Sequence, residues 1–117
     1  MRLIAMIAAL AALTAPALAQ DYSNYSEDAL RAELARIAMA ETKVLVPMRD
    51  GIGLSTDIYR PREADGDVPV IFWRTPYNFN TLSGSRLRMA VEAVNRGYAF
   101  VIQNERGRYF SEGEFEI

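Results

Sequence analysis

The sequence contains no cysteine and no histidine among its 117 residues. Without cysteine, the chain cannot form disulfides, a thiolate zinc site or a cysteine nucleophile. Without histidine, it cannot contain a complete Ser-His-Asp triad or a histidine-ligated metal ion. Any catalysis in which the chain takes part therefore needs a proton shuttle from elsewhere, and we expect it to bind no metal and no cofactor.

An excess of charge of one sign is also missing. The 13 Lys and Arg residues are nearly balanced by 15 Asp and Glu residues, which leaves a net charge of −2. Nucleic-acid-binding proteins carry a basic field, so no nucleic-acid partner is expected. Hydrophobic residues make up 50% of the chain, which is ordinary for a globular protein, and the length is sufficient for one small domain.

Residues 1–19 have the pattern of an export signal. A positive residue, Arg2, precedes an apolar run at 3–13, and the segment closes with an A-x-A ending at Ala19. This order is typical of a cleaved secretory signal peptide. The alternative is an N-terminal membrane anchor, but the apolar run is short for a membrane span. We therefore expect cleavage after Ala19, a secreted or periplasmic protein, and no stable membrane association of the mature chain.

Residues 20–41 form a predicted N-terminal linker and amphipathic helix. Ser26 is a good N-cap residue, and the acidic residues that follow it suit the first turn of a helix. Apolar residues recur at helical spacing after that, and the pattern predicts a helix over residues 27–40. We expect this helix to pack against the domain; a helix that binds a partner is the alternative.

A β-hairpin is predicted next, within an assigned domain at residues 42–117. Its strands lie at about 43–47 and 54–60. Between them stands Asp50-Gly51, a dipeptide typical of tight turns because glycine accepts a positive φ.

The rest of the domain has the pattern of a βαβ unit. Residues 68–73 and 98–103 are nearly all apolar, β-branched or aromatic, a composition typical of strands buried on both faces. An amphipathic helix lies between them and ends at Gly97. This order predicts two parallel strands joined by a right-handed crossover. Ligands of open α/β sheets bind beyond the carboxyl ends of the strands, which here carry residues 74–78 and 104–108.

The chain ends at Ile117 with no cap or polar terminator. A hairpin plus a βαβ unit would leave sheet edges and one sheet face uncovered. We therefore expect the chain to be the beginning of a longer α/β protein. A small periplasmic binding module, complete at 117 residues, is the alternative.

Tyr77 is the strongest candidate for a functional residue. It follows a strand end and the rigid Thr75-Pro76 step, so its hydroxyl lies near the expected ligand crevice. A phenol can donate a hydrogen bond to an oxyanion at neutral pH; a tyrosine packed on its loop is the alternative. Arg74 and Arg106 also follow strands, and each could bind a carboxylate or hold its own loop together.

Two other features carry weaker signals. Ser111 lies near glycines but lacks the first glycine of the G-x-S-x-G nucleophile motif. The sequence from Glu105 to Glu116 is rich in glutamate, which indicates a solvated acidic loop rather than a carboxylate site.

Three blocks of the sequence resemble the CocE/NonD family of hydrolases. They are VPMRDGIGLSTDIYRP at 46–61, VPVIFWRTPYN at 68–78 and RGYAFVIQNERGRYFSEGEF at 96–115. This Xaa-Pro dipeptidyl-peptidase-like group includes cocaine esterase, α-amino-acid ester hydrolases and glutaryl cephalosporin acylases. The resemblance implies an α/β-hydrolase fold, of which this chain would supply the N-terminal portion.

The resemblance also implies a serine acyl hydrolase whose triad lies beyond Ile117, so this segment alone is expected to be inactive. In that family the tyrosine at the position of Tyr77 donates its hydroxyl to the oxyanion hole. Asn104 stands where the family usually has aspartate, a change that we place at the rim of the expected site. The implied substrate is a small ester, amide or peptide. Dipeptidyl-peptidase activity is an alternative that no residue before Ile117 distinguishes, and the oligomeric state is not indicated.

Overall fold

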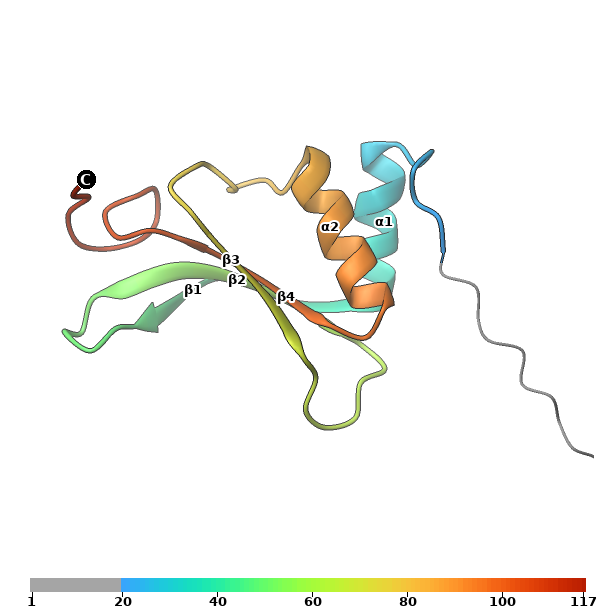
Figure 1. Ribbon diagram of the computed structural model, residues 1–117, viewed down its shortest axis with the longest axis horizontal. Helices are drawn as coiled ribbons and strands as arrows, with labels where there is room; N and C mark the ends of the chain where they lie inside the picture. Colours follow the sequence, from blue (N-terminus) through green and yellow to red (C-terminus); the bar gives the residue numbers. More distant parts are fainter. Residues whose placement is uncertain (1–19) are drawn as a thin grey trace, which may run out of the picture.

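Both helices lie on one face of a four-stranded sheet in the computed structural model, which describes residues 20–117 (Figure 1). The expected signal peptide, residues 1–19, lies outside the described residues. The elements in chain order are α1 (Glu27–Ile37), β1 (Ala38–Pro47), β2 (Gly53–Pro61), β3 (Val70–Thr75), α2 (Gly84–Asn95) and β4 (Ala99–Asn104). Neither helix is long and apolar enough to cross a membrane within this part of the chain.

Helix α1 begins as predicted but ends earlier. The Ser26 hydroxyl accepts a hydrogen bond from the Ala29 backbone N–H at 3.2 Å, which confirms the N-cap. The predicted end at Ala40 is wrong, because the chain is already extended at Ala38. Residues 38–41 instead pair with β2. The hydrogen bonds of the sheet thus outweigh the high intrinsic helical propensity of this segment, which consists of Ala, Met and Glu, and the division that we placed at 41/42 falls within β1.

The hairpin forms around the predicted turn. Gly51 has φ 84°, a left-handed conformation that glycine adopts readily. Its N–H donates to the Met48 carbonyl at 2.9 Å, and the Met48 N–H donates to the Ile52 carbonyl at 2.8 Å. Strands β1 and β2 are antiparallel and extend further than predicted.

A bulge in β1 carries a buried ion pair that the sequence pattern does not indicate. The register shifts between Glu41 and Val44, and Lys43 has φ 56°. The carboxylate of Asp57 in β2 accepts hydrogen bonds from the Lys43 N–H at 2.7 Å and from its Nζ at 2.9 Å. Asp57 is only 3% exposed. The bulge therefore brings a backbone donor and a cation to the same buried carboxylate.

The βαβ unit is confirmed. Strands β3 and β4 are parallel, with Val70 opposite Ala99 and Thr75 opposite Asn104, and α2 joins them. Strand β4 also pairs with β2 in the antiparallel sense, so the strand order is β1-β2-β4-β3. The order places β4 inside the sheet and β3 at its edge. Gly97, with φ 86°, follows α2 as expected.

The two strands differ in burial, which corrects one expectation. Phe100 and Ile102 of β4 are fully buried, whereas Val70 and Phe72 of β3 are 55% and 52% exposed. The prediction that β3 is buried on both faces is therefore wrong for this part of the chain. Within residues 20–117, the helices cover one face of the sheet, and no described segment covers β3 on the opposite face (Figure 1).

The core lies between the two helices and the sheet. Leu30 and Leu34 of α1 are buried with Leu87 and Val91 of α2. Phe79, from the loop after β3, is buried at 1% exposure in the same cluster. This loop is therefore anchored to the core two residues after Tyr77, which bears on the site described next.

Candidate functional site

The carboxyl ends of β3 and β4 lie side by side. Thr75 and Asn104 are register partners at these ends, so the loops that follow the two strands leave the sheet together (Figure 1). This is the edge of an open α/β sheet at which ligands bind. It is also the edge at which the sequence predicted functional residues.

The turn after β3 carries Tyr77 to the surface. The Tyr77 N–H donates to Oγ1 of Thr75 at 3.1 Å, which closes a tight side-chain turn over Pro76. Tyr77 itself is 71% exposed. The alternative of a tyrosine packed on its loop therefore does not fit the described residues, and the hydroxyl is available to a ligand.

Side chains from the end of β4 and from the loop after it bind all three carbonyl groups of this turn. Nδ2 of Asn104 donates to the carbonyl oxygens of Thr75 and Tyr77, each at 3.0 Å. Nε of Arg108 donates to the carbonyl oxygen of Pro76, also at 3.0 Å. Asn104 is 1% exposed. Its expected place at the rim of the site is therefore wrong: it lies beneath the turn and supports it.

The two arginines singled out from the sequence are held by this chain's own groups. The guanidinium of Arg74 donates twice to Oε1 of Gln103, at 3.1 and 2.8 Å. Arg106 forms an ion pair with Asp50 at 2.9 Å, and the hydrogen bond from Arg106 lowers the pKa of that carboxyl. These contacts indicate that both arginines hold their own loops together, and they weigh against the binding of a ligand's carboxylate by either one.

Ser111 is a buried structural residue. Its hydroxyl donates to the Asn104 carbonyl at 2.9 Å and accepts from the Ser55 N–H at 2.8 Å. It is only 8% exposed, so it ties the loop after β4 to the hairpin. Glu112 also ties this loop to the hairpin, since its Oε1 accepts a hydrogen bond from the Gly53 N–H at 2.7 Å. Within residues 20–117, no group of three or more His, Cys, Asp or Glu residues is placed to hold a metal ion.

Comparison with known proteins places the chain in a family. The sequence model of the X-Pro dipeptidyl-peptidase family (S15 family) matches residues 50–117, more than half of the chain. The chain belongs to the S15 family. The S15 match covers β2, β3, α2 and β4 together with the loops that carry Tyr77 and Arg108.

A relative of this chain is a hydrolase. This chain is 50% identical over 76 residues to cocaine esterase from Rhodococcus sp. (strain MB1 Bresler), a stretch that covers 63% of this chain and 13% of that protein. The chain therefore spans a small part of the length of this relative.

Solved structures agree with this assignment. An α-amino acid ester hydrolase matches with a TM-score of 0.56 and 27% identity over 90% of this chain and 17% of its own. An aminopeptidase from the marine sediment archaeon Thaumarchaeota archaeon matches with a TM-score of 0.56 and 29% identity, covering 68% and 14%. A CocE/NonD family hydrolase from Staphylococcus aureus matches at 0.51 and 25%, covering 62% and 16%. The predicted resemblance to CocE/NonD hydrolases and the α/β fold class are confirmed.

The strand and motif pattern of the sequence did not indicate the role of Asn104 and Arg108. A usable signal was present: a turn with three successive carbonyl groups needs donors, and Pro76 supplies no N–H of its own. In a parallel pair the nearest donors come from the loop after the adjacent strand. The amide and guanidinium side chains near the end of the adjacent strand, and not the alternation of apolar residues, would have indicated these hydrogen bonds.

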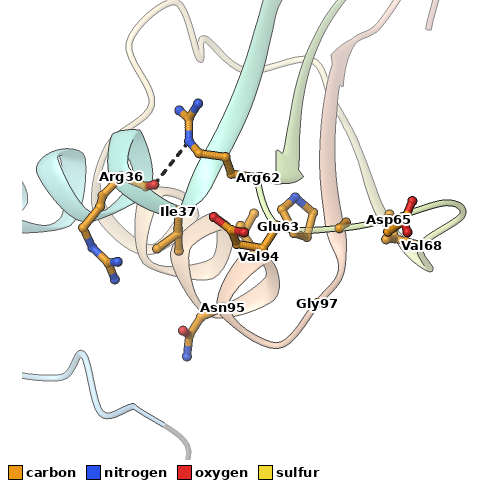
Figure 2. A pocket seen from close by; sticks show the side chains of 11 residues that line it. Arg36, Ile37, Arg62, Glu63, Asp65, Val68, Val94, Asn95 and Gly97 are labelled. Atoms are coloured by element: carbon orange, nitrogen blue, oxygen red, sulfur yellow. Dashed lines mark hydrogen bonds between the residues drawn. The ribbon is translucent and has the colours of Figure 1, made fainter.

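A cavity of about 560 Å³ lies at the opposite end of the sheet (Figure 2). Val68 and Gly97, which precede β3 and β4, line it together with Arg62. The Arg62 guanidinium donates to three carbonyl groups at the end of α1, at 2.8 to 3.3 Å. Arg62 therefore caps a helix, and the cavity is remote from Tyr77.

Proposed function

We propose that this chain forms the N-terminal part of an exported serine hydrolase that cleaves ester or amide bonds, in which Tyr77 donates a hydrogen bond to the oxyanion. The observation that carries the proposal is the exposed Tyr77 side chain on a turn fixed at the carboxyl end of β3. Family membership and hydrolase relatives support the reaction class.

The proposed chemistry is acyl transfer through a Ser-His-Asp triad. A serine attacks the substrate carbonyl, and a histidine takes its proton and later returns it to the leaving group. This chain contains no histidine, so the triad belongs to sequence beyond it. The contribution of this chain is the Tyr77 hydroxyl, which stabilises the negative charge that develops on the carbonyl oxygen of the substrate.

Two substrate classes have support. The 50% identity to cocaine esterase favours a small ester, whereas the S15 family and the aminopeptidase structure favour a peptide. We propose ester hydrolysis as the main activity, because that relative shares the highest identity among those described here. Membership of a hydrolase family also weighs against a non-enzymatic binding module.

The experiment uses the full-length protein with an aryl ester, an amide and an Xaa-Pro dipeptide amide as substrates. We expect the highest kcat/KM with the ester and loss of activity after treatment with a serine-directed inhibitor. Preference for the Xaa-Pro substrate would favour the peptidase alternative. Absence of inhibitor-sensitive hydrolysis of all three would contradict the proposal.

Export is tested separately. The A-x-A ending at Ala19 leads us to propose signal cleavage before Gln20. N-terminal sequencing of the protein from the periplasm or medium should give a chain that begins at Gln20. A mature protein that still begins at Met1 would contradict this part of the proposal.

A further inference from the structure

The turn that carries Tyr77 has its backbone fixed by another part of the chain. Asn104 and Arg108, which we call the carbonyl clamp, bind the carbonyl oxygens of Thr75, Pro76 and Tyr77 at 3.0 Å. Three successive carbonyl groups thus point to donors at the end of β4 and on the loop after it. These bonds fix the backbone at Tyr77 and so set the direction in which its side chain points. The tyrosine ring itself takes no part in them.

In this chain Asn104 supplies an amide donor at this place. Both atoms near its Nδ2 are carbonyl oxygens, which can only accept hydrogen bonds. The Thr75 carbonyl also accepts from the Glu105 N–H at 3.1 Å, but Oδ1 turned toward the two carbonyl oxygens would donate to neither. An aspartate carboxylate, which the family usually has at this position, cannot donate to them either. The bridge therefore depends on the amide and not on the size of the side chain.

Asn104 is itself held firmly. It ends β4 opposite Thr75 in the parallel register, its carbonyl accepts from the Ser111 hydroxyl at 2.9 Å, and it is 1% exposed. Loss of the amide removes one of the two bonds that the Thr75 carbonyl accepts and takes from the Tyr77 carbonyl its donor on β4. The clamp thus connects the rigid centre of the sheet to the exposed tyrosine.

We propose that Asn104 and Arg108 are positioning residues that hold the Tyr77 hydroxyl at the oxyanion. This inference rests on the proposed function, since it assigns the clamp to the same reaction. Oxyanion stabilisation demands a donor within a narrow range of distances, and a displacement of about 1 Å can cost roughly 10²-fold in rate. Removal of the clamp should therefore lower kcat although neither side chain contacts the substrate.

The test compares matched variants of the full-length enzyme with one ester substrate. Asn104→Ala should lower kcat by about tenfold to 100-fold, and Arg108→Met by about tenfold, with KM changed less than about threefold. Arg106→Met makes the same change in a neighbouring arginine that contacts Asp50 and not the turn. This control should keep kcat within about twofold of wild type.

The same clamp substitutions made in the Tyr77→Phe variant show whether the clamp acts through Tyr77. In Tyr77→Phe, the hydroxyl is already absent, so Asn104→Ala should lower kcat by less than about threefold. An equal loss of kcat in both backgrounds would overturn the inference, because the clamp would then act elsewhere. A melting curve of each variant confirms folding. If Asn104→Ala does not fold, Arg108→Met is compared in the same two backgrounds.

Failure of the inference can be told apart from failure of the proposed function. If Tyr77→Phe lowers kcat but the clamp variants do not, the positioning role is wrong and the oxyanion role stands. If Tyr77→Phe keeps the kcat of wild type, the oxyanion role is wrong and the positioning role falls with it. Clamp variants that change only the melting temperature would show a purely structural contact.

Discussion

The two ends of the β3–β4 pair use similar hydrogen bonds for different purposes. At the amino end, Arg62 binds three carbonyl groups where α1 finishes. At the carboxyl end, Asn104 and Arg108 bind three carbonyl groups of the turn that carries Tyr77. The first set closes a helix terminus, where the exposed side chain of Arg36 is already in an ion pair with Glu33. The second fixes a turn whose tyrosine is 71% exposed.

The comparison shows that the number of hydrogen bonds does not mark a functional site. Both anchors satisfy carbonyl groups that would otherwise lack partners. The difference lies in what the anchored segment displays, which at the carboxyl end is a hydroxyl donor at the ligand-binding edge of the sheet. Changes at one end should therefore alter catalysis, and changes at the other should alter stability.

The largest effect is expected from Tyr77→Phe in the full-length enzyme. Loss of one oxyanion donor lowers kcat by about 10²–10³, or roughly 2.7–4 kcal/mol of transition-state stabilisation. The ring is retained and largely exposed, so KM and the melting temperature should change little. Steady-state kinetics and a thermal melt check this. Retention of more than about half of the wild-type kcat would contradict the proposed difference between the two ends, because the carboxyl end would then be no more catalytic than the amino end.

An intermediate effect, on stability, is expected from Asp57→Asn. The Asp57 carboxylate is 4% exposed and binds Lys43, whose Nζ lies 4.6 Å from the centre of the Phe79 ring. Breaking a buried pair costs about 3–5 kcal/mol; the Lys43 side chain is 29% exposed, so we expect roughly 2–3 kcal/mol here.

Denaturant unfolding of the full-length protein measures this loss, with Asp50→Asn as the control. Asp50 forms an ion pair with Arg106 in which its side chain is 56% exposed, so its loss should cost less than about 1 kcal/mol. Equal effects of the two substitutions would show that the buried pair contributes no more than a surface pair.

The smallest effect is expected from Arg62→Met at the amino end. Its bonds cap α1 at a solvent-exposed position, so their loss should lower the free energy of unfolding by about 1 kcal/mol. We expect kcat to stay within about twofold of wild type because no clamp contact changes. The kcat and the melting temperature of Arg62→Met and Arg108→Met, measured side by side, show whether the two ends differ in function. A fall in kcat for Arg62→Met as large as that for Arg108→Met would remove the distinction between the ends.

Local signals predicted much of the fold. Ser26 caps α1 because its hydroxyl competes well for the first N–H groups, and Asp50-Gly51 turns the hairpin because Gly51 adopts a positive φ. The βαβ order followed from apolar runs around a helical period. The end of α1 could not be predicted, since pairing of residues 38–41 with β2 is a tertiary effect.

The candidate site was predictable only in part. Motif resemblance and the strand-end rule led to Tyr77, but composition could not show that β3 lies at an edge with Phe72 exposed. Asn104 stood where the family usually has aspartate, and a carboxylate cannot donate the bonds that Asn104 makes. The contact depends on the parallel register of β3 and β4, which no local pattern contains.

An inhibitor that forms an oxyanion in the active site tests whether the Tyr77 hydroxyl binds this charge. A trifluoromethyl ketone matched to the ester substrate adds to the serine and carries a negatively charged oxygen where the oxyanion of the transition state would lie. Its inhibition constant should rise by about 10²-fold or more in Tyr77→Phe, in proportion to the fall in kcat/KM. An inhibition constant equal to that of the wild-type enzyme would contradict the account.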